Sequence, residues 1–119
     1  LMTVAKIIKS SIRGEDMASR YGGEEFTVML YNANRSEAIA VAERIRKNIE
    51  KNDFYYQGQH MQVTISGGIS IFSAETNPVT SAKVLVDQAD RALYLSKRNG
   101  RNRVTCAAPG TDSESGEAK

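Results

Sequence analysis

The sequence predicts a mixed α/β fold, an α/β sandwich in which helices pack on a mainly antiparallel sheet. Three observations support this class. Apolar residues recur at helical spacing near residues 1–12, 35–51 and 81–99. Short segments of alternating apolar and polar residues, separated by glycine-containing turns, predict strands between these helices. Because a two-stranded hairpin alone is at best marginally stable, we expect the later helices to cover the sheet.

Composition excludes several classes of protein. The 119 residues make one small domain at most, and no apolar run approaches the length of a membrane span. The net charge of +2 gives no reason to expect nucleic acid or a membrane surface as a partner. The single Cys106 cannot form an internal disulfide, which fits a reducing cytoplasm, and one histidine with one cysteine makes a zinc site improbable.

The first predicted hairpin joins a strand at residues 17–21 to a strand at residues 26–31 through Gly22-Gly23-Glu24-Glu25. Glycine reaches positive φ without steric cost, so the two glycines suit a tight turn that exposes bare peptide groups. Two adjacent carboxylates there suit a magnesium ion shared with substrate phosphates. The alternative is a solvated hairpin with acids at its tip, and the four residues alone favour that alternative.

Capping residues place the helices. The first helix carries an apolar stripe and should fray near Gly14. Its stripe consists of Leu1, Val4, Ile8 and Ile12. Asn34 and Glu37 form a capping-box pair that begins the second helix, which should run to about Lys51. Thr80 or Ser81 caps the last helix, and Gly100 stops it.

The remaining strands lie between and after these helices. Residues 54–56, a turn at Gly58 and residues 61–66 read as strand, turn and strand. Gly67-Gly68 should interrupt the second of these strands as a bulge or a point of close approach, after which it continues. Residues 104–106 predict a final short strand.

Two cations close the last helix. Lys97 lies in its final turn and Arg101 just past Gly100. A lysine and an arginine four residues apart could flank one polyphosphate. The alternative is that the basic residues only complement the helix dipole, and this segment alone favours that alternative.

Three blocks together resemble the GGDEF domain of bacterial diguanylate cyclases. They are residues 20–26, with the signature in its Glu variant, residues 63–66 followed by Gly68, and residues 89–102. The resemblance covers about residues 1–104 and corresponds to the C-terminal two-thirds of such a domain. It implies a palm-like nucleotidyl-cyclase fold without its first strand and following helix. We therefore expect a partial domain at residues 1–106 and a disordered acidic tail at 107–119.

The resemblance implies that two GTP molecules condense to cyclic di-GMP and two pyrophosphates. The 3′-hydroxyl of one GTP attacks the α-phosphate of the other, in a homodimer of facing domains, with Mg²⁺ or Mn²⁺ on the phosphates. The expected setting is the bacterial cytoplasm, where this segment would be the cytoplasmic domain of a larger, membrane-bound or multidomain sensor. No nucleic acid or membrane contact is expected of this segment.

The same resemblance assigns roles to individual residues. Glu24 matches the metal-binding carboxylate that could also help to deprotonate the attacking hydroxyl, and Glu25 matches a metal-shell or structural carboxylate. Gly22 and Gly23 let the turn approach the nucleotide. The residues that match the family's contacts to the terminal phosphates are Lys97 and Arg101.

A product-inhibition site is also implied, at an Arg-x-x-Asp motif five residues before the signature. Arg13 would read the guanine edge or a phosphate, Asp16 would accept from guanine nitrogens, and Arg44 matches a further arginine of that site. Without the resemblance, a polar loop and a solvated helix arginine would explain these residues.

Two departures from the family limit the prediction. Gly67 stands where the family has an apolar residue, and we expect a small packing defect there. The family's opening segment, which supplies a metal-binding Asp and the residues that read guanine, has no match. The chain alone should therefore bind GTP poorly and make no product.

The rival hypotheses are a non-catalytic module that senses cyclic di-GMP or GTP, and a structural domain that regulates a neighbour. The catalytic hypothesis expects the acidic hairpin and the cationic helix end to converge on one triphosphate.

Overall fold

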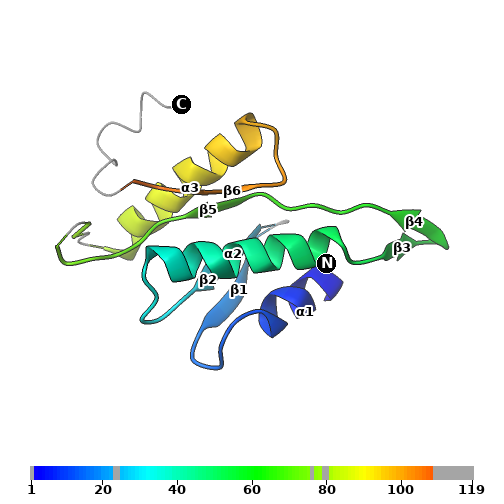
Figure 1. The fold of residues 1–119 in the computed structure, drawn as a ribbon, viewed down its shortest axis with the longest axis horizontal. Coiled ribbons are helices and arrows are strands. Elements are labelled where there is room, and N and C mark those ends of the chain that lie inside the picture. The colour runs from blue at the N-terminus through cyan, green and yellow to red at the C-terminus, as the bar shows by residue number, and fades with distance from the viewer. Residues whose placement is uncertain (1, 23–24, 76, 79–80, 109–119) are drawn as a thin grey trace. The chain divides into compact units, whose positions relative to one another are not determined.

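The computed structural model describes residues 2–22, 25–75, 77–78 and 81–108 (Figure 1). The chain forms two compact units, Leu1–Val63 and Thr64–Lys119, and each is described by itself. Most of the predicted tail, residues 109–119, lies outside the described residues. The elements are mixed helices and short strands, as the sequence predicts, and two of the three strand pairings are antiparallel.

The first unit contains two helices and two hairpins. Its elements are α1 (Met2–Ser10), β1 (Met17–Gly22), β2 (Glu25–Met29), α2 (Arg35–Glu50), β3 (Phe54–Tyr56) and β4 (Gln59–Met61). The strands pair as β1 with β2 and as β3 with β4, both antiparallel. Each hairpin is therefore a separate two-stranded sheet.

Helix α1 buries Val4 and Ile8, which confirms the predicted apolar stripe at these positions. It ends at Ser10 and does not reach Gly14, so the predicted end is wrong. The hydroxyls of Ser10 and Ser11 both donate to the Ile7 carbonyl oxygen, at 2.9 and 2.7 Å. Because such side-chain bonds compete with the helical backbone ladder, they account for the earlier end.

Helix α2 begins with the predicted capping box. The Glu37 N–H donates to Asn34 Oδ1 and the Asn34 N–H donates to Glu37 Oε1, each at 2.8 Å. The helix buries Ala38, Ile45 and Ile49 and contacts α1. These apolar side chains and the two buried residues of α1 form the core of the first unit.

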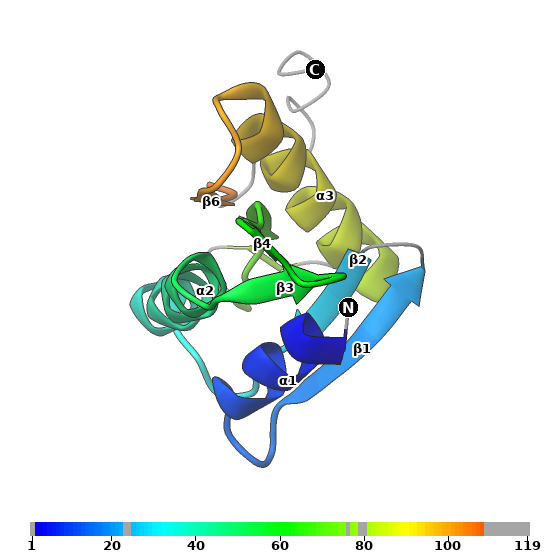
Figure 2. The same ribbon diagram turned by 90° about the vertical axis from the view of Figure 1, so that its right-hand side faces the viewer.

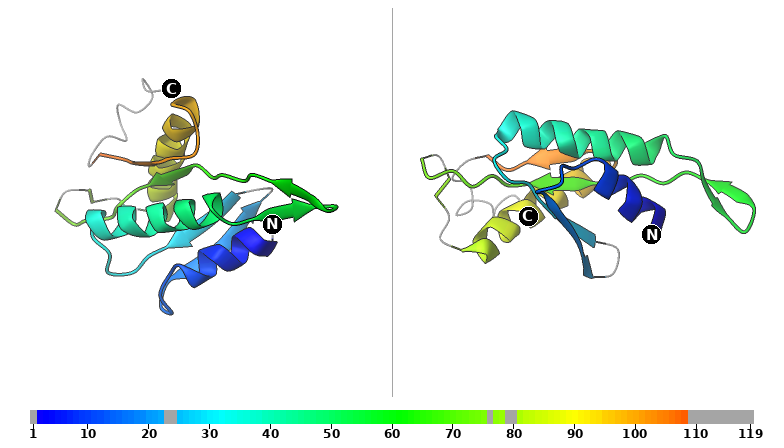
Figure 3. Two further views of the ribbon diagram at one scale, coloured as in Figure 1. Left: turned by 45° about the vertical axis from the view of Figure 1, so that its right-hand side comes forward. Right: turned by 90° about the horizontal axis from the view of Figure 1, so that it is seen from below.

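The two hairpins differ at their turns. In β1–β2 the register runs from Met17 opposite Met29 to Gly22 opposite Glu25, while Gly23 and Glu24 lie outside the described residues. In β3–β4 the turn residues Gln57 and Gly58 have φ values of 51° and 80°. Two successive positive φ values are typical of the type I′ turn that matches strand twist. This second hairpin extends beyond the C-terminal end of α2 (Figure 3).

The second unit is a parallel strand pair covered by one helix. Strand β5 (Gly67–Ile69) pairs with β6 (Val104–Cys106), and α3 (Ala82–Arg98) packs against both (Figures 1 and 2). The predicted strand at residues 61–66 is wrong beyond Met61, because β4 ends there and residues 62–66 have no strand pairing. Pairing resumes at Gly67, so the two glycines begin a strand and do not interrupt one.

The two glycines of β5 fit two different neighbours. A Cβ at Gly68 would lie 2.1 Å from the Ala89 carbonyl oxygen and 2.3 Å from the Leu93 nitrogen of α3. The predicted close approach is therefore confirmed, since only glycine lets strand and helix meet at this distance. A Cβ at Gly67 would lie 3.0 Å from Cγ1 of Val104. The predicted packing defect at Gly67 is wrong, because Val104 fills that space.

Polar contacts fix α3 at its start and along its buried face. Ser81 caps the helix by accepting from the Val84 N–H at 3.3 Å, while Thr80 lies outside the described residues. Asn77 and Gln88 are both buried, and their amides exchange hydrogen bonds of 2.8 and 3.3 Å.

Across the described residues, every helix is too short or too polar to cross a membrane.

Candidate functional site

The carboxylate stretch lies at the tip of the β1–β2 hairpin. Gly22 ends β1 and pairs with Glu25, which begins β2 and is exposed. The predicted site residues Gly23 and Glu24 lie outside the described residues. Carboxylate oxygens are the donor type that Mg²⁺ prefers. Within the described ranges no three His, Cys, Asp or Glu side chains are grouped to hold a metal, and the metal site expected at Glu24 and Glu25 stays a prediction.

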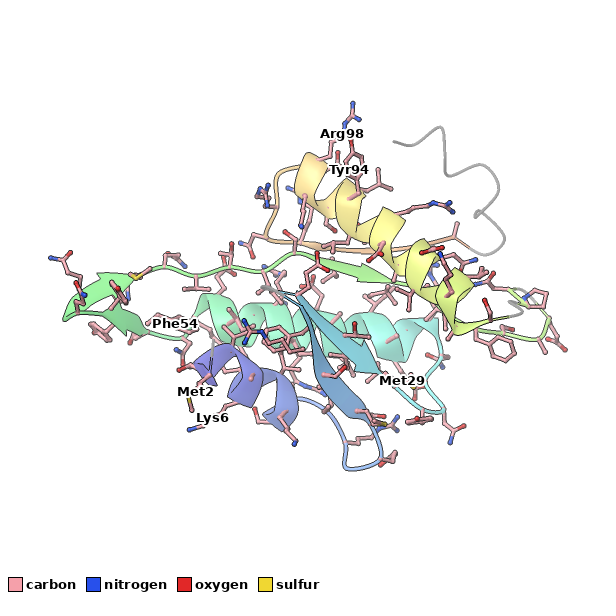
Figure 4. The ribbon with its side chains drawn as sticks, turned by 180° about the vertical axis from the view of Figure 1, so that it is seen from behind. Met2, Lys6, Met29, Phe54, Tyr94 and Arg98 are labelled. Atoms are coloured by element: carbon pink, nitrogen blue, oxygen red, sulfur yellow. The ribbon has the colours of Figure 1, made fainter. Side chains whose placement is uncertain are left out.

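The predicted phosphate contacts lie at the end of α3. Lys97 is exposed in the last helical turn, and Arg101 is exposed after Gly100. The Arg101 N–H donates to the Ser96 carbonyl oxygen at 2.9 Å, which is the long bond of a Schellman-type helix end. Figure 4 shows Tyr94 and Arg98 projecting outward from the same part of α3. Three arginine or lysine side chains, at positions 97, 98 and 101, are thus exposed within five residues.

The Arg-x-x-Asp loop between α1 and β1 is closed by its own aspartate. Asp16 Oδ2 accepts from the Arg13 N–H at 3.0 Å and from Arg13 Nε at 3.4 Å. Asp16 Oδ1 accepts from the Tyr31 N–H at 3.0 Å. Arg13 Nη2 in turn donates to the Tyr31 carbonyl oxygen at 2.6 Å. Arg13 and Asp16 together therefore hold both backbone groups of Tyr31, just after β2.

Burial separates the roles of the two charged residues. The Asp16 side chain is 1% exposed, whereas that of Arg13 is 52% exposed and also lies 3.5 Å from Glu15 Oε2. The backbone N–H of Tyr31 lowers the pKa of Asp16 below its ordinary value, and the N–H and guanidinium of Arg13 add to this although burial opposes it. The aspartate is therefore ionised and hydrogen-bonded within the protein, whereas about half of the Arg13 side chain is exposed.

Arg44 of α2 lies beside the same loop. Its Nη2 donates to the carbonyl oxygen of Ser11, the residue that follows α1. A shallow hollow of about 230 Å³ is bordered by Arg13, Asp16 and Arg44. The rest of its lining consists of Leu30, Ala33, Glu37, Ala40 and Val41. The structure therefore brings together all three residues that the resemblance assigns to product inhibition.

Two residues at or beside this hollow were not predicted from sequence. Beside the hollow, the backbone N–H and carbonyl of Tyr31 bond Asp16 and Arg13, and backbone groups leave no side-chain signal in a sequence. Glu37 reaches the hollow from the first turn of α2, where its side chain also completes the capping box. Because the capping box already accounts for Glu37, there was no reason in the sequence to expect the same side chain in the lining of the hollow.

Comparison with known proteins identifies the class. Residues 1–103 match the family described as diguanylate cyclase, GGDEF domain, so the chain belongs to the GGDEF family. Diguanylate cyclase A of Treponema denticola is 56% identical over 105 residues, which are 88% of this chain and 28% of that protein. The chain thus spans less than a third of that relative. Diguanylate cyclase DosC of Escherichia coli is 35% identical over 105 residues, 87% of this chain and 22% of the relative.

Solved structures agree with the fold. The GGDEF domain of DgcB from Caulobacter crescentus, solved in complex with c-di-GMP, has a TM-score of 0.79 and 33% identity, covering 87% of this chain and 60% of that one. The active GGEEF domain of a diguanylate cyclase from Vibrio cholerae has a TM-score of 0.77 and 31% identity, covering 92% and 67%. The mixed α/β, nucleotidyl-cyclase-like fold predicted from the sequence is confirmed.

Proposed function

We propose that the protein is a diguanylate cyclase that condenses two GTP molecules into cyclic di-GMP in the bacterial cytoplasm. The observation that carries this proposal is the intact GGEEF signature between two paired strands, in a chain that matches the GGDEF family over residues 1–103. The reaction forms two bonds, and in each the 3′-oxygen of one GTP attacks the α-phosphorus of the other. Pyrophosphate leaves with the bridging oxygen, and the hydroxyl proton is lost to a base. A second copy of the domain supplies the second nucleotide.

Each proposed group has a chemical reason for its role. Glu24 and Glu25 supply hard oxygen donors for Mg²⁺ or Mn²⁺, which when bound neutralises phosphate charge. Gly22 and Gly23 allow the turn to approach the nucleotide closely. The exposed cations proposed to bind the terminal phosphates are Lys97 and Arg101.

Replacement of one signature carboxylate tests the catalytic proposal. Glu24→Ala in the intact protein should lower the rate of cyclic di-GMP formation at least about 100-fold, because the metal loses a ligand. Glu75→Ala removes an exposed carboxylate from the second unit and should leave the rate unchanged. Product formation is measured by chromatography of reactions with GTP and Mg²⁺. Full activity of Glu24→Ala would contradict the catalytic role. A wild-type protein that binds cyclic di-GMP or GTP but makes no product would instead support the sensor hypothesis.

We also propose that the product inhibits the enzyme at the hollow beside Arg13. The support is geometric: Arg13 and Arg44 border one hollow, and Arg13 is half exposed. Both guanidinium groups donate to backbone carbonyl oxygens, those of Tyr31 and Ser11. Ligand phosphate or guanine oxygens would replace these acceptors. Because Asp16 is almost fully buried, we propose that it shapes the loop and that the arginines make the main ligand contacts.

This second proposal has its own test. Arg13→Ala should raise the cyclic di-GMP concentration needed for half inhibition at least about tenfold, because a charge-assisted contact is lost. Lys47→Ala removes an exposed cation from the same helix as Arg44, away from the lining of the hollow, and is the matched control. Initial rates at fixed GTP and increasing cyclic di-GMP give the value. Unchanged inhibition in Arg13→Ala would place the inhibitory site elsewhere.

A further inference from the structure

The turn that carries Arg101 has an unusual backbone. Three consecutive residues have positive φ: Gly100 at 121°, Arg101 at 62° and Asn102 at 48°. Glycine adopts such values readily, but other residues do so at a cost of roughly 1–3 kcal/mol each. Two non-glycine residues in succession are therefore stable there only if surrounding contacts hold them.

Hydrogen bonds from three places hold this turn. The Arg101 N–H donates to the Ser96 carbonyl oxygen at 2.9 Å. Arg103 Nε donates to the Arg101 carbonyl oxygen at 3.2 Å. The Asn102 N–H donates to the hydroxyl oxygen of Ser66 at 3.1 Å. Both peptide groups that flank the Arg101 Cα are thus fixed, one of them through a side chain 36 residues earlier in the sequence.

Ser66 is the member of this set that holds the turn through a side chain from outside both the turn and α3. Its neighbour Gly67 donates its N–H to the Arg103 carbonyl oxygen at 2.9 Å, so β5 and the turn are joined at two successive residues. Ser96 acts on Arg101 through its backbone. Its hydroxyl is instead used to bond the Gly67 carbonyl oxygen at 2.8 Å and Thr105 Oγ1 at 2.7 Å.

We propose that Ser66 is a positioning residue for phosphate binding. By accepting the Asn102 N–H, its hydroxyl keeps residues 100–102 in the left-handed conformation and aims the Arg101 guanidinium at the terminal phosphates of GTP. This inference rests on the proposed function, since it needs Arg101 to bind those phosphates. It gives a role to the serine of the sequence block at residues 63–66, which lies just before β5 and outside any strand.

The test compares four single variants, and the double variant of Ser66→Ala with Arg101→Ala, in the intact protein. Ser66→Ala removes the acceptor and Ser66→Thr keeps a hydroxyl. Ser70→Ala is the matched control, because the Ser70 hydroxyl likewise makes a hydrogen bond to backbone, but its partner is the Leu85 carbonyl oxygen of α3, at 2.6 Å, and not the turn. Arg101→Ala removes the proposed phosphate contact itself. The readouts are the KM for GTP and kcat, and the inhibition constants of inorganic tripolyphosphate and of GMP, which lacks the terminal phosphates.

Ser66→Ala should raise the KM for GTP and the inhibition constant of tripolyphosphate about five- to tenfold, as expected for the loss of one hydrogen bond. It should leave the inhibition constant of GMP unchanged, and Ser66→Thr and Ser70→Ala should stay within about twofold of wild type. In the Arg101→Ala background, Ser66→Ala should add nothing. Should Ser66→Ala not fold, Ser66→Cys keeps the volume with a weaker acceptor and should give a smaller shift of the same kind.

Two results would overturn the inference while the proposed function stands. In one, Arg101→Ala raises the inhibition constant of tripolyphosphate but Ser66→Ala does not. In the other, Ser66→Ala raises the inhibition constants of tripolyphosphate and GMP equally, which marks a general structural defect. A wild-type protein that neither binds nor converts GTP, or an Arg101→Ala variant with normal tripolyphosphate inhibition, would overturn the proposed role of Arg101 first. The inference would fall with it.

Discussion

Gly68 gives the sharpest prediction of stability. A Cβ at this position would meet three backbone atoms of α3, at 2.1, 2.3 and 2.8 Å. Ordinary van der Waals contact begins at 3.4 Å, so the nearest atom is too close by about 1.3 Å. Backbone atoms in a helix cannot turn away as the end of a flexible side chain can. Gly68→Ala therefore has to move α3 off β5 as a body.

The expected cost follows from this geometry. Adding one methylene to a packed core costs about 1–3 kcal/mol when side chains can shift, and more when they cannot. We expect Gly68→Ala to lower the free energy of unfolding by at least about 3 kcal/mol, a large share of the stability of a small domain. Urea unfolding followed by far-UV circular dichroism measures the change, and hydrogen exchange of the α3 amides shows where it acts.

Two other glycines provide graded controls. A Cβ at Gly14 meets nothing within 4 Å, so Gly14→Ala should be neutral or stabilising by up to about 1 kcal/mol. Gly67→Ala meets a side chain, Val104 Cγ1 at 3.0 Å, and should have an intermediate cost that Val104→Ala partly relieves. Equal stability of the Gly14→Ala and Gly68→Ala proteins would refute the reasoning, because it would mean that the strand and the helix are not in close contact.

Two further predictions concern the first unit. The folded-state pKa of Asp16 lies below its unfolded value of about 3.8, so its ionised form stabilises the protein above that pH, and this contribution is lost as the pH falls through the lower folded value. The urea midpoints of wild type and Asp16→Asn should therefore differ at pH 7 and approach each other below pH 4; a constant difference down to pH 2.5 would contradict this. Asn34→Ala should lower the free energy of unfolding by about 1 kcal/mol, because the capping box with Glu37 is lost. Asn34→Ser should retain most of the stability, since serine also caps helices. Equal thermal unfolding of both variants would show that the cap contributes little.

The sequence was a good guide where local chemistry decides the structure. The capping box at Asn34, the cap at Ser81 and the turn at Gly58 each depend on residues a few positions apart, and all three are present. The antiparallel pairing of the strands on either side of the signature also followed from the sequence, with Gly22 opposite Glu25. Local patterns of this kind give the elements and their order.

Predictions failed where distant groups decide the structure. Residues 62–66 have strand-like alternation but no pairing, and strand formation needs a partner that alternation does not reveal. The space beside Gly67 is filled by Val104, which is 37 residues later in the sequence and cannot be seen from the glycine itself. The end of α1 was set by two serine hydroxyls that compete with the backbone.

The same distinction separates the two residues of the Arg-x-x-Asp motif. From spacing alone, Arg13 and Asp16 are equivalent candidates for ligand contact. In the folded loop, one carboxylate oxygen of Asp16 accepts from Arg13 and the other accepts from the backbone N–H of Tyr31, and only 1% of the Asp16 side chain is exposed. Asp16→Asn should consequently disturb product inhibition by loosening the loop, with a parallel loss of stability. Arg13→Ala should disturb inhibition by removing a ligand contact, and the remaining carboxylate bond to the Tyr31 N–H would still hold the end of β2. An Asp16→Asn protein that keeps its stability but loses inhibition would show that the aspartate binds the ligand directly.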